Sequence, residues 1–129
     1  MQPASTAPQP ISDEDELYRR LVSQAIRPDG TVSSYAFMLR REPDPSISVD
    51  LARLTTPSET ATRTGRLGAG VGAFLARVPR ALGLHVRHDP QLDNPAHSLI
   101  EGAATKAHCR QLAEAVRIVI PPQSASVSP

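Results

Sequence analysis

Turn-forming residues interrupt this chain so often that only short secondary-structure elements fit between them. Arg27-Pro28-Asp29-Gly30, Glu42-Pro43-Asp44-Pro45, Asp89-Pro90 and Asp93-Asn94-Pro95 all combine proline with residues that favour turns. The intervals hold candidate strands joined by short turns, without the helical crossovers that a parallel sheet needs. The pattern therefore predicts an α+β fold, in which a small mixed or antiparallel sheet of short strands is followed by a C-terminal amphipathic helix.

The two ends of the 129-residue chain differ in composition from the middle. Residues 1–10 and 121–129 are rich in Pro, Ser, Ala and Gln, and carry too little apolar surface to offset the entropy lost on ordering. We therefore expect a disordered N-terminal tail over residues 1–10, a single α+β domain over 11–120 and a disordered C-terminal tail over 121–129.

The start of the domain allows two interpretations. Ser12 followed by the acidic run Asp13–Glu16 is typical of a helix N-terminus. The apolar residues that follow are at helical spacing: Leu17, Leu21, Val22, Ala25 and Ile26. Pro28 would end such a helix. Residues 17–22 alternatively form a first strand, and of the two interpretations we prefer the helix.

Four further segments have the composition of strands. They are residues 31–39, 47–51, 71–76 and 84–88. Residues 96–100 form another short element, and residues 77–83 form a short turn or helix closed by Gly83. The polar stretch 55–70 is expected to be a mobile loop or a covering segment, and residues 42–45 a loop without regular structure.

The clearest helix lies near the C-terminus. Thr105 is a typical N-cap residue, and Pro121 is expected to stop the helix. One face is apolar and consists of Cys109, Leu112, Ala113, Val116 and Ile120. Cys109 is therefore predicted to be a core residue, and as the only cysteine it forms no internal disulfide.

Charge and composition limit the partners. The formal net charge is +1 and only 3% of the residues are aromatic, so neither a global field nor many stacking faces favour nucleic acid. Duplex nucleic acid is the least favoured partner. The most apolar window, residues 67–86, is interrupted by Arg77, Pro79 and Arg80, which predicts no membrane span. Without a signal-peptide pattern, we expect a cytoplasmic protein, and no motif calls for a cofactor.

Residues 60–88 contain no acidic residue, but they hold five arginines and four closely spaced glycines. These are Arg63, Arg66, Arg77, Arg80, Arg87, Gly65, Gly68, Gly70 and Gly72. Glycines let main-chain N–H groups approach an anion, and guanidinium groups match phosphate geometry. The simpler interpretation is a flexible loop with solvated arginines. The acidic run Asp13–Glu16 either approaches this basic segment or marks a partner surface.

The spacing of histidine and cysteine argues against a metal site. His85 and His88 would point to opposite faces of the strand predicted at residues 84–88. His108 and Cys109 are neighbours on the C-terminal helix and diverge around its axis. We therefore expect no metal ligand set.

His97 is the strongest candidate for chemistry. It follows the rigid turn that contains Asn94 and Pro95, and Asp93 lies four residues before it. A carboxylate near an imidazole holds one tautomer for acid–base work. The same arrangement suits a structural histidine that hydrogen-bonds turn backbone, and this alternative stays open.

Four segments occur together in the chain: Leu17-Tyr18-Arg19-Arg20, Ser33-Ser34-Tyr35-Ala36-Phe37, Ile47-Ser48-Val49-Asp50 and Asn94-Pro95-Ala96-His97-Ser98-Leu99-Ile100-Glu101-Gly102. Their combination resembles a group of small, uncharacterised bacterial single-domain proteins. The resemblance covers most of residues 17–121 and implies no established activity. It does imply that Arg19, Ser33, Ser34 and His97 form one site.

Two functions are consistent with these observations. The first is a non-catalytic binding or accessory module that acts with a protein partner, because no complete catalytic set is present. The alternative is a small enzyme acting on a phosphate-bearing substrate such as a nucleotide or an RNA end. In that case His97 is the general acid or base, Ser34 orients the substrate, and Arg19, Arg63 and Arg66 are the candidate phosphate ligands.

Overall fold

The computed structural model describes residues 7–39, 42–43, 46–63, 65, 68–102 and 104–123. Arg66 and the outer parts of both predicted tails lie outside the described residues. The inner parts of both tails hydrogen-bond to the domain. The Gln9 main-chain N donates to His88 Nδ1 at 2.9 Å, and the Gln123 main-chain N donates to the Gly68 oxygen at 2.8 Å.

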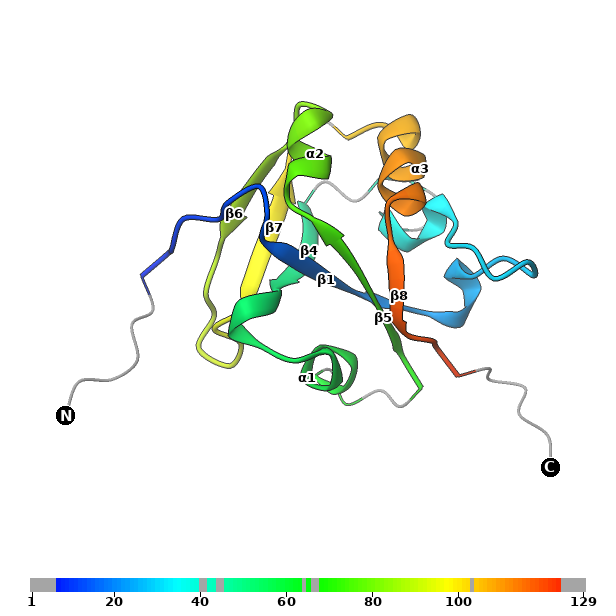
Figure 1. Cartoon of the computed structure of the whole chain (residues 1–129), viewed down its shortest axis with the longest axis horizontal. Helices are drawn as coiled ribbons and strands as arrows, with labels where there is room; N and C mark the ends of the chain where they lie inside the picture. The colour runs from blue at the N-terminus through cyan, green and yellow to red at the C-terminus, as the bar shows by residue number, and fades with distance from the viewer. Residues whose placement is uncertain are drawn as a thin grey trace.

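A six-stranded sheet forms the centre of the molecule, with strand order β6-β7-β4-β1-β5-β8 and antiparallel pairing throughout (Figure 1). Its strands are β1 (Glu16–Leu21), β4 (Ser46–Leu51), β5 (Gly70–Leu75), β6 (His85–His88), β7 (His97–Glu101) and β8 (Arg117–Ile120). The longest ladder joins β1 to β5, from the pair Glu16↔Leu75 to the pair Leu21↔Gly70. The predicted α+β class with a C-terminal helix is confirmed, and the sheet is antiparallel.

Short elements connect these strands. The helices are α1 (Pro57–Thr62), α2 (Arg77–Ala81) and α3 (Lys106–Glu114), and the 3-10 turns are η1 (Ser23–Ala25), η2 (Ser34–Phe37) and η3 (Ala52–Leu54). A separate two-stranded ribbon consists of β2 (Met38–Leu39) and β3 (Glu42–Pro43). Figure 1 shows α2 and α3 near one end of the sheet and α1 near the other. Within the described residues, no helix is long and apolar enough to cross a membrane.

The core lies on one face of the sheet, where α3 packs against η2. Ile47, Val49 and Leu51 on β4 are buried on the core face, whereas Ser46 and Ser48 on the other face are exposed. Asp50 lies on the same face as the two serines but is buried. Phe37 from η2 packs edge-to-face on Phe74 at a centroid distance of 5.6 Å. One face of the sheet is thus filled by apolar side chains, and the other remains available for polar groups.

The preferred helix at the start of the domain is wrong, and the strand that was its alternative is correct. Residues 16–21 form β1, and only the three residues of η1 are helical in the segment that follows. Leu17 and Leu21 are both fully buried, because side chains four residues apart share a face in a strand as well as in a helix. Helical spacing therefore does not separate the two structures at this position.

Two further predictions are corrected, and one open alternative is decided. The strand predicted at residues 31–39 forms only at its end, as β2, and residues 34–37 are η2 instead. Ser33 Oγ caps η2 by accepting a hydrogen bond from the Tyr35 N. For the stretch predicted as a mobile loop or a covering segment, the second alternative is correct, because it contains α1, which packs against β1 and β5. Thr56 Oγ1 caps α1 by accepting from the Glu59 N at 3.1 Å. Residues 42–43, predicted to lack regular structure, pair with β2.

The C-terminal helix begins as predicted and ends early. Thr105 Oγ1 accepts from the His108 N at 3.1 Å, while His108 Nδ1 accepts from the Thr105 N at 3.2 Å, so the two residues form a capping box. Cys109 is fully buried, as predicted. Ile120 does not extend the helical stripe, because residues 117–120 add β8 to the edge of the sheet beside β5.

The closely spaced glycines have a packing role on β5. A Cβ at Gly70 would overlap the Ile120 carbonyl oxygen and the Pro122 N, and one at Gly72 would overlap Val116 Cγ1. These two residues therefore let the C-terminal segment cross β5 closely. For Gly70 and Gly72, close packing against the C-terminal segment therefore explains the glycines, and an approach of the main chain to an anion does not.

We expect Gly70→Ala to lower the free energy of unfolding by about 1–3 kcal/mol, because the new methyl group meets main chain that must shift. Gly30→Ala is the matched variant. Its φ is +89° and no atom lies within 4 Å of the added Cβ, so it should cost only the strain of the left-handed conformation, about 1 kcal/mol. Urea denaturation measures both, and equal losses would show that β5 accommodates the methyl group.

Candidate functional site

The two central strands β1 and β4 separate shortly after they meet. They pair only at Leu17↔Leu51 and Tyr18↔Asp50. The Arg19 side chain occupies the opening, where its Nε donates to the Ala36 carbonyl oxygen at 2.9 Å and its Nη1 donates to the Ser48 carbonyl oxygen at 2.7 Å. Its guanidinium carbon lies 5.6 Å from the Phe37 ring centroid. Arg19 thus bridges β1, η2 and β4.

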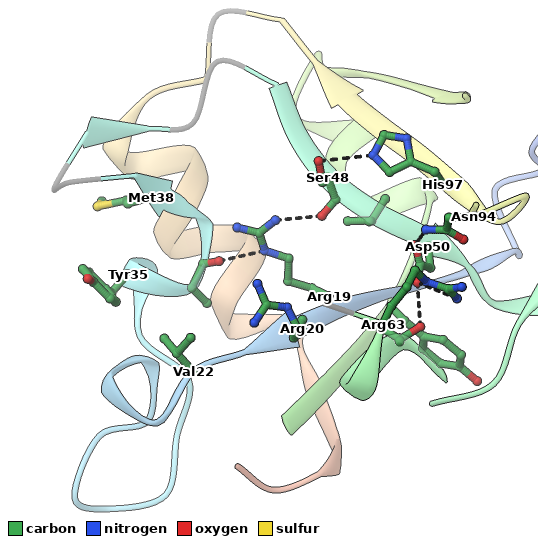
Figure 2. A pocket seen from close by; sticks show the side chains of 14 residues that line it. Arg19, Arg20, Val22, Tyr35, Met38, Ser48, Asp50, Arg63, Asn94 and His97 are labelled. Carbon is green, nitrogen blue, oxygen red and sulfur yellow. Dashed lines mark hydrogen bonds and ion pairs between the residues drawn. The ribbon is translucent and has the colours of Figure 1, made fainter. Parts of the chain in front are cut away.

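A pocket of about 580 Å³ lies over this opening (Figure 2). One side is largely apolar and is lined by Val22, Tyr35, Ala36 and Met38. Three arginines also line the pocket: Arg19 and Arg20 lie between this side and the opposite one, whereas Arg63 lies beside Asp50 (Figure 2). The opposite side is mostly polar and is lined by Tyr18, Ser48, Val49, Asp50, Thr60, Asn94 and His97. This division suits a ligand with one apolar part and one anionic part.

Asp50 is the one carboxylate among the described residues that line the pocket, and its oxygens are already engaged. Oδ2 accepts from Thr60 Oγ1 at 2.7 Å and lies 3.5 Å from Arg63 Nη2, while Oδ1 accepts from Asn94 Nδ2 at 2.9 Å. Thr60 and Arg63 come from α1 and its end, whereas Asn94 comes from the turn before β7. The buried carboxylate therefore fixes two loops beside β4.

Two nitrogens near the pocket lack a partner in the described part of the chain. They are Arg20 Nη1 and Arg63 Nε, and both are shielded from solvent. Leaving such a donor unpaired costs about 1–3 kcal/mol. Because Arg20 lines the pocket, a turn of its guanidinium toward a bound anion would give this nitrogen an acceptor.

His97 connects a carboxylate to a hydroxyl. Its Nδ1 lies 3.1 Å from Asp89 Oδ2 and 3.1 Å from the Asp89 carbonyl oxygen, and its Nε2 lies 3.3 Å from Ser48 Oγ. Since both neighbours of Nδ1 are acceptors, Nδ1 carries a proton and donates a hydrogen bond to Asp89. In the neutral imidazole, Nε2 then accepts from the Ser48 hydroxyl.

Asp89 is itself held by neighbouring residues. Arg87 Nη1 lies 3.4 Å from Asp89 Oδ1, and Gln91 Nε2 donates to Asp89 Oδ2 at 2.9 Å. Arg87 also forms two hydrogen bonds with Glu101, through Nε at 2.8 Å and through Nη2 at 3.1 Å. The hydrogen bond from Arg87 lowers the pKa of Glu101, and in turn raises the pKa of Arg87.

The pocket contains three of the five site residues that the sequence suggests. Arg19, Arg63 and His97 line it. Ser34 begins η2 and is not among the lining residues; Ser48 supplies the hydroxyl beside His97 instead. Arg66 lies outside the described residues, so its predicted role as a phosphate ligand stays a prediction.

Sequence reasoning also missed several residues of the site. The carboxylate beside His97 belongs to Asp89 and not to Asp93, which is exposed on the turn. Arg20 and Asp50 were not singled out, although both lie in segments that carry the resemblance. Alternation in the segment 47–50 was the available indication, because it places Ser48 and Asp50 on the same polar face.

The other polar clusters that the sequence suggested have structural explanations. The buried His88 accepts from Gln9 through Nδ1, and its Nε2 lies 2.7 Å from the Pro95 carbonyl oxygen, while His85 is exposed on the opposite face. Among the described residues, no group of three or more His, Cys, Asp or Glu residues is arranged to hold a metal ion. The acidic run is paired within the chain, through Asp13–Arg80, Asp15–Arg53 and Glu16–Arg117.

Comparison with known proteins finds no match for this chain among family models, curated proteins or solved structures. The resemblance to small bacterial proteins therefore stays a prediction. Each of its four segments does supply residues to the pocket, namely Arg19, Tyr35, Ser48 and His97 among others. The function has to be argued from this geometry.

We expect Asp50→Asn to lower the free energy of unfolding by about 1.5–3 kcal/mol, because one amide oxygen cannot serve the three donors that now share a carboxylate. Asp93→Asn removes an exposed carboxylate from the neighbouring turn and should change the stability by less than about 0.5 kcal/mol. Thermal or urea unfolding compares the two. Similar losses in both variants would contradict the central role of Asp50.

Arg87→Met should raise the pKa of Glu101 toward its ordinary value, since the hydrogen bond from Arg87 is the main cause of the lowered pKa. A carboxylate with a lowered pKa in the folded state stabilises the fold above its unfolded pKa, and this contribution is lost as the pH falls through the folded pKa. NMR titration of the Glu101 carboxyl carbon measures the shift. Arg77→Met is the control and should leave the pKa of Glu101 unchanged. If Arg87→Met also left it unchanged, the Arg87–Glu101 ion pair would not be the cause of the lowered pKa.

Proposed function

We propose that this chain is a binding module for a small phosphate-bearing molecule, held in the pocket over the opening between β1 and β4. The observation that carries the proposal is the charge of the lining. Among the described residues, three arginines line the pocket, and the one carboxylate is already engaged by Thr60, Arg63 and Asn94. A phosphate group is a suitable ligand, because guanidinium groups bind its oxygens in a fork geometry.

Arg20 differs from many of the other arginines in the described chain. Arg53, Arg80, Arg87 and Arg117 all have a carboxylate within salt-bridge distance. Arg20 has none among the described ion pairs, and its Nη1 lacks a hydrogen-bond partner in the described residues. A cation placed at the wall of a pocket without a counter-ion favours an anionic ligand.

The apolar side of the pocket indicates what else the ligand contains. Val22, Tyr35 and Met38 form a surface next to the arginines, and Tyr35 is 42% exposed at its edge. An aromatic ring of the ligand could stack on Tyr35 while its phosphate reaches Arg20. A nucleotide or an RNA end has both parts, so these remain the proposed ligands.

A small enzyme acting on the same ligands is the second candidate. His97 favours it, because Asp89 orients the imidazole and leaves Nε2 facing the pocket. We also propose a protein partner and a cytoplasmic location, and both rest on the sequence alone. The acidic run offers less support for a partner surface, since three of its carboxylates are paired within the chain.

Titration with inorganic phosphate and with a nucleoside monophosphate, followed by NMR and calorimetry, tests the proposal. We expect the nucleotide to bind more tightly, and Arg20→Met to weaken phosphate binding about tenfold or more, the effect of one charge-assisted hydrogen bond. Arg77→Met is the control, because Arg77 is exposed on α2 and does not line the pocket. Absence of binding, or equal weakening by both substitutions, would refute the phosphate site.

A further inference from the structure

We propose that Ser48 is a nucleophile activated by His97, and that the pocket hydrolyses phosphate monoesters through a phosphoserine intermediate. The inference rests on the proposed phosphate site and adds a chemical step to it. It replaces Ser34, the hydroxyl suggested by the sequence, with the one that contacts the imidazole. The residues concerned are Ser48, His97 and Asp89, with Arg19 and Arg20 beside them.

The three groups form a hydroxyl–imidazole–carboxylate chain. Ser48 Oγ lies 3.3 Å from His97 Nε2, and His97 Nδ1 lies 3.1 Å from Asp89 Oδ2. This is the order of contacts by which a base activates a serine while a carboxylate orients the base. The distances are at the long end of hydrogen-bond range, as is common for such groups without a bound substrate.

Three adjacent strands fix these groups relative to one another. Ser48 is on β4, His97 begins β7 and Asp89 follows β6. In the β4–β7 ladder Asp50 pairs with His97 and Ser48 pairs with Leu99, so Ser48 and His97 are diagonal neighbours on one face. Groups held by neighbouring strands keep their geometry better than groups on separate loops.

Ser48 is accessible and lies beside the cationic centre of the pocket. Its residue is exposed and lines the pocket together with Arg19 and Arg20. Arg19 Nη1 donates to the Ser48 carbonyl oxygen at 2.7 Å, which fixes a guanidinium group next to the nucleophile (Figure 2). A phosphoryl group bound there would have its non-bridging oxygens near positive charge, which stabilises the charge of the transition state.

The reaction has two steps. In the first, Ser48 Oγ forms a bond to phosphorus while the bond to the leaving oxygen breaks; the serine proton passes to His97 Nε2 and then to the leaving oxygen. In the second, water attacks the phosphorus and gives its proton to His97 Nε2. The bond from Ser48 Oγ to phosphorus breaks, the serine regains a proton from His97, and inorganic phosphate leaves.

The test measures release of p-nitrophenol from p-nitrophenyl phosphate by the full chain, with phosphate binding measured in parallel. We expect turnover by the unchanged protein, at least about a 10³-fold loss in Ser48→Ala and a loss of about 10²- to 10⁴-fold in His97→Gln. Ser46→Ala is the matched control, since Ser46 is an exposed serine on the same face of β4. Circular dichroism and unfolding curves verify that each variant is folded.

The outcomes separate this inference from the proposed function. Phosphate binding without turnover would overturn the catalytic role of Ser48 and leave the binding module intact. Turnover that persists in Ser48→Ala would overturn Ser48 as the nucleophile. Equal losses of turnover in Ser48→Ala and Ser46→Ala would do the same. Absence of both binding and turnover would refute the two proposals together.

Discussion

The Arg19 guanidinium replaces a stretch of β-ladder between the two central strands, and the pocket depends on this replacement. Where β1 and β4 separate, the ladder between them no longer supplies hydrogen-bond partners. Arg19 donates there to two main-chain acceptors, the carbonyl oxygens of Ala36 on η2 and Ser48 on β4. A planar guanidinium has several donors in a fixed fork and reaches both at once, which the compact ammonium of lysine does not do. Arg19 therefore holds β1, η2 and β4 together at the point where the ladder between the two strands ends.

Asp50 organises the polar side of that opening. A carboxylate this buried is costly unless donors surround it, and Thr60, Arg63 and Asn94 supply them. The donors come from two connecting segments, and α1 alone has only six residues, too few for a stable isolated helix. Its attachment to the sheet rests on these hydrogen bonds and on the burial of Thr60 and Ala61. The Asp50 carboxylate therefore offsets part of the positive charge of the pocket and also positions α1 and the Asn94 turn, which line it.

The sequence predicts parts of this structure that depend on local pattern and misses parts that depend on pairing. The strands β4, β5 and β6 follow from composition and turns, and β7 was expected only as a short element. Leu17 and Leu21 fit either a helix or a strand because of their spacing. His97 could be singled out by its residue type and its rigid turn. Ser48 and Asp89 could not, because they approach His97 only through the pairing of β4, β7 and β6. Distances of this kind are set by register, which a single sequence does not display.

The register of β4 against β7 holds the core and the candidate site together. Val49 pairs with Ser98 and Asp50 with His97, which places Ser48 and His97 on the open face and Val49 in the core. A slip by one residue would expose Val49 and bury Ser48, and full burial of a valine is worth about 1.5–3 kcal/mol. Asp50 adds a second constraint, because its carboxylate must also meet the Asn94 amide on the turn that leads into β7. The contacts that oppose slippage are thus the ones that keep the hydroxyl and the imidazole within hydrogen-bond distance.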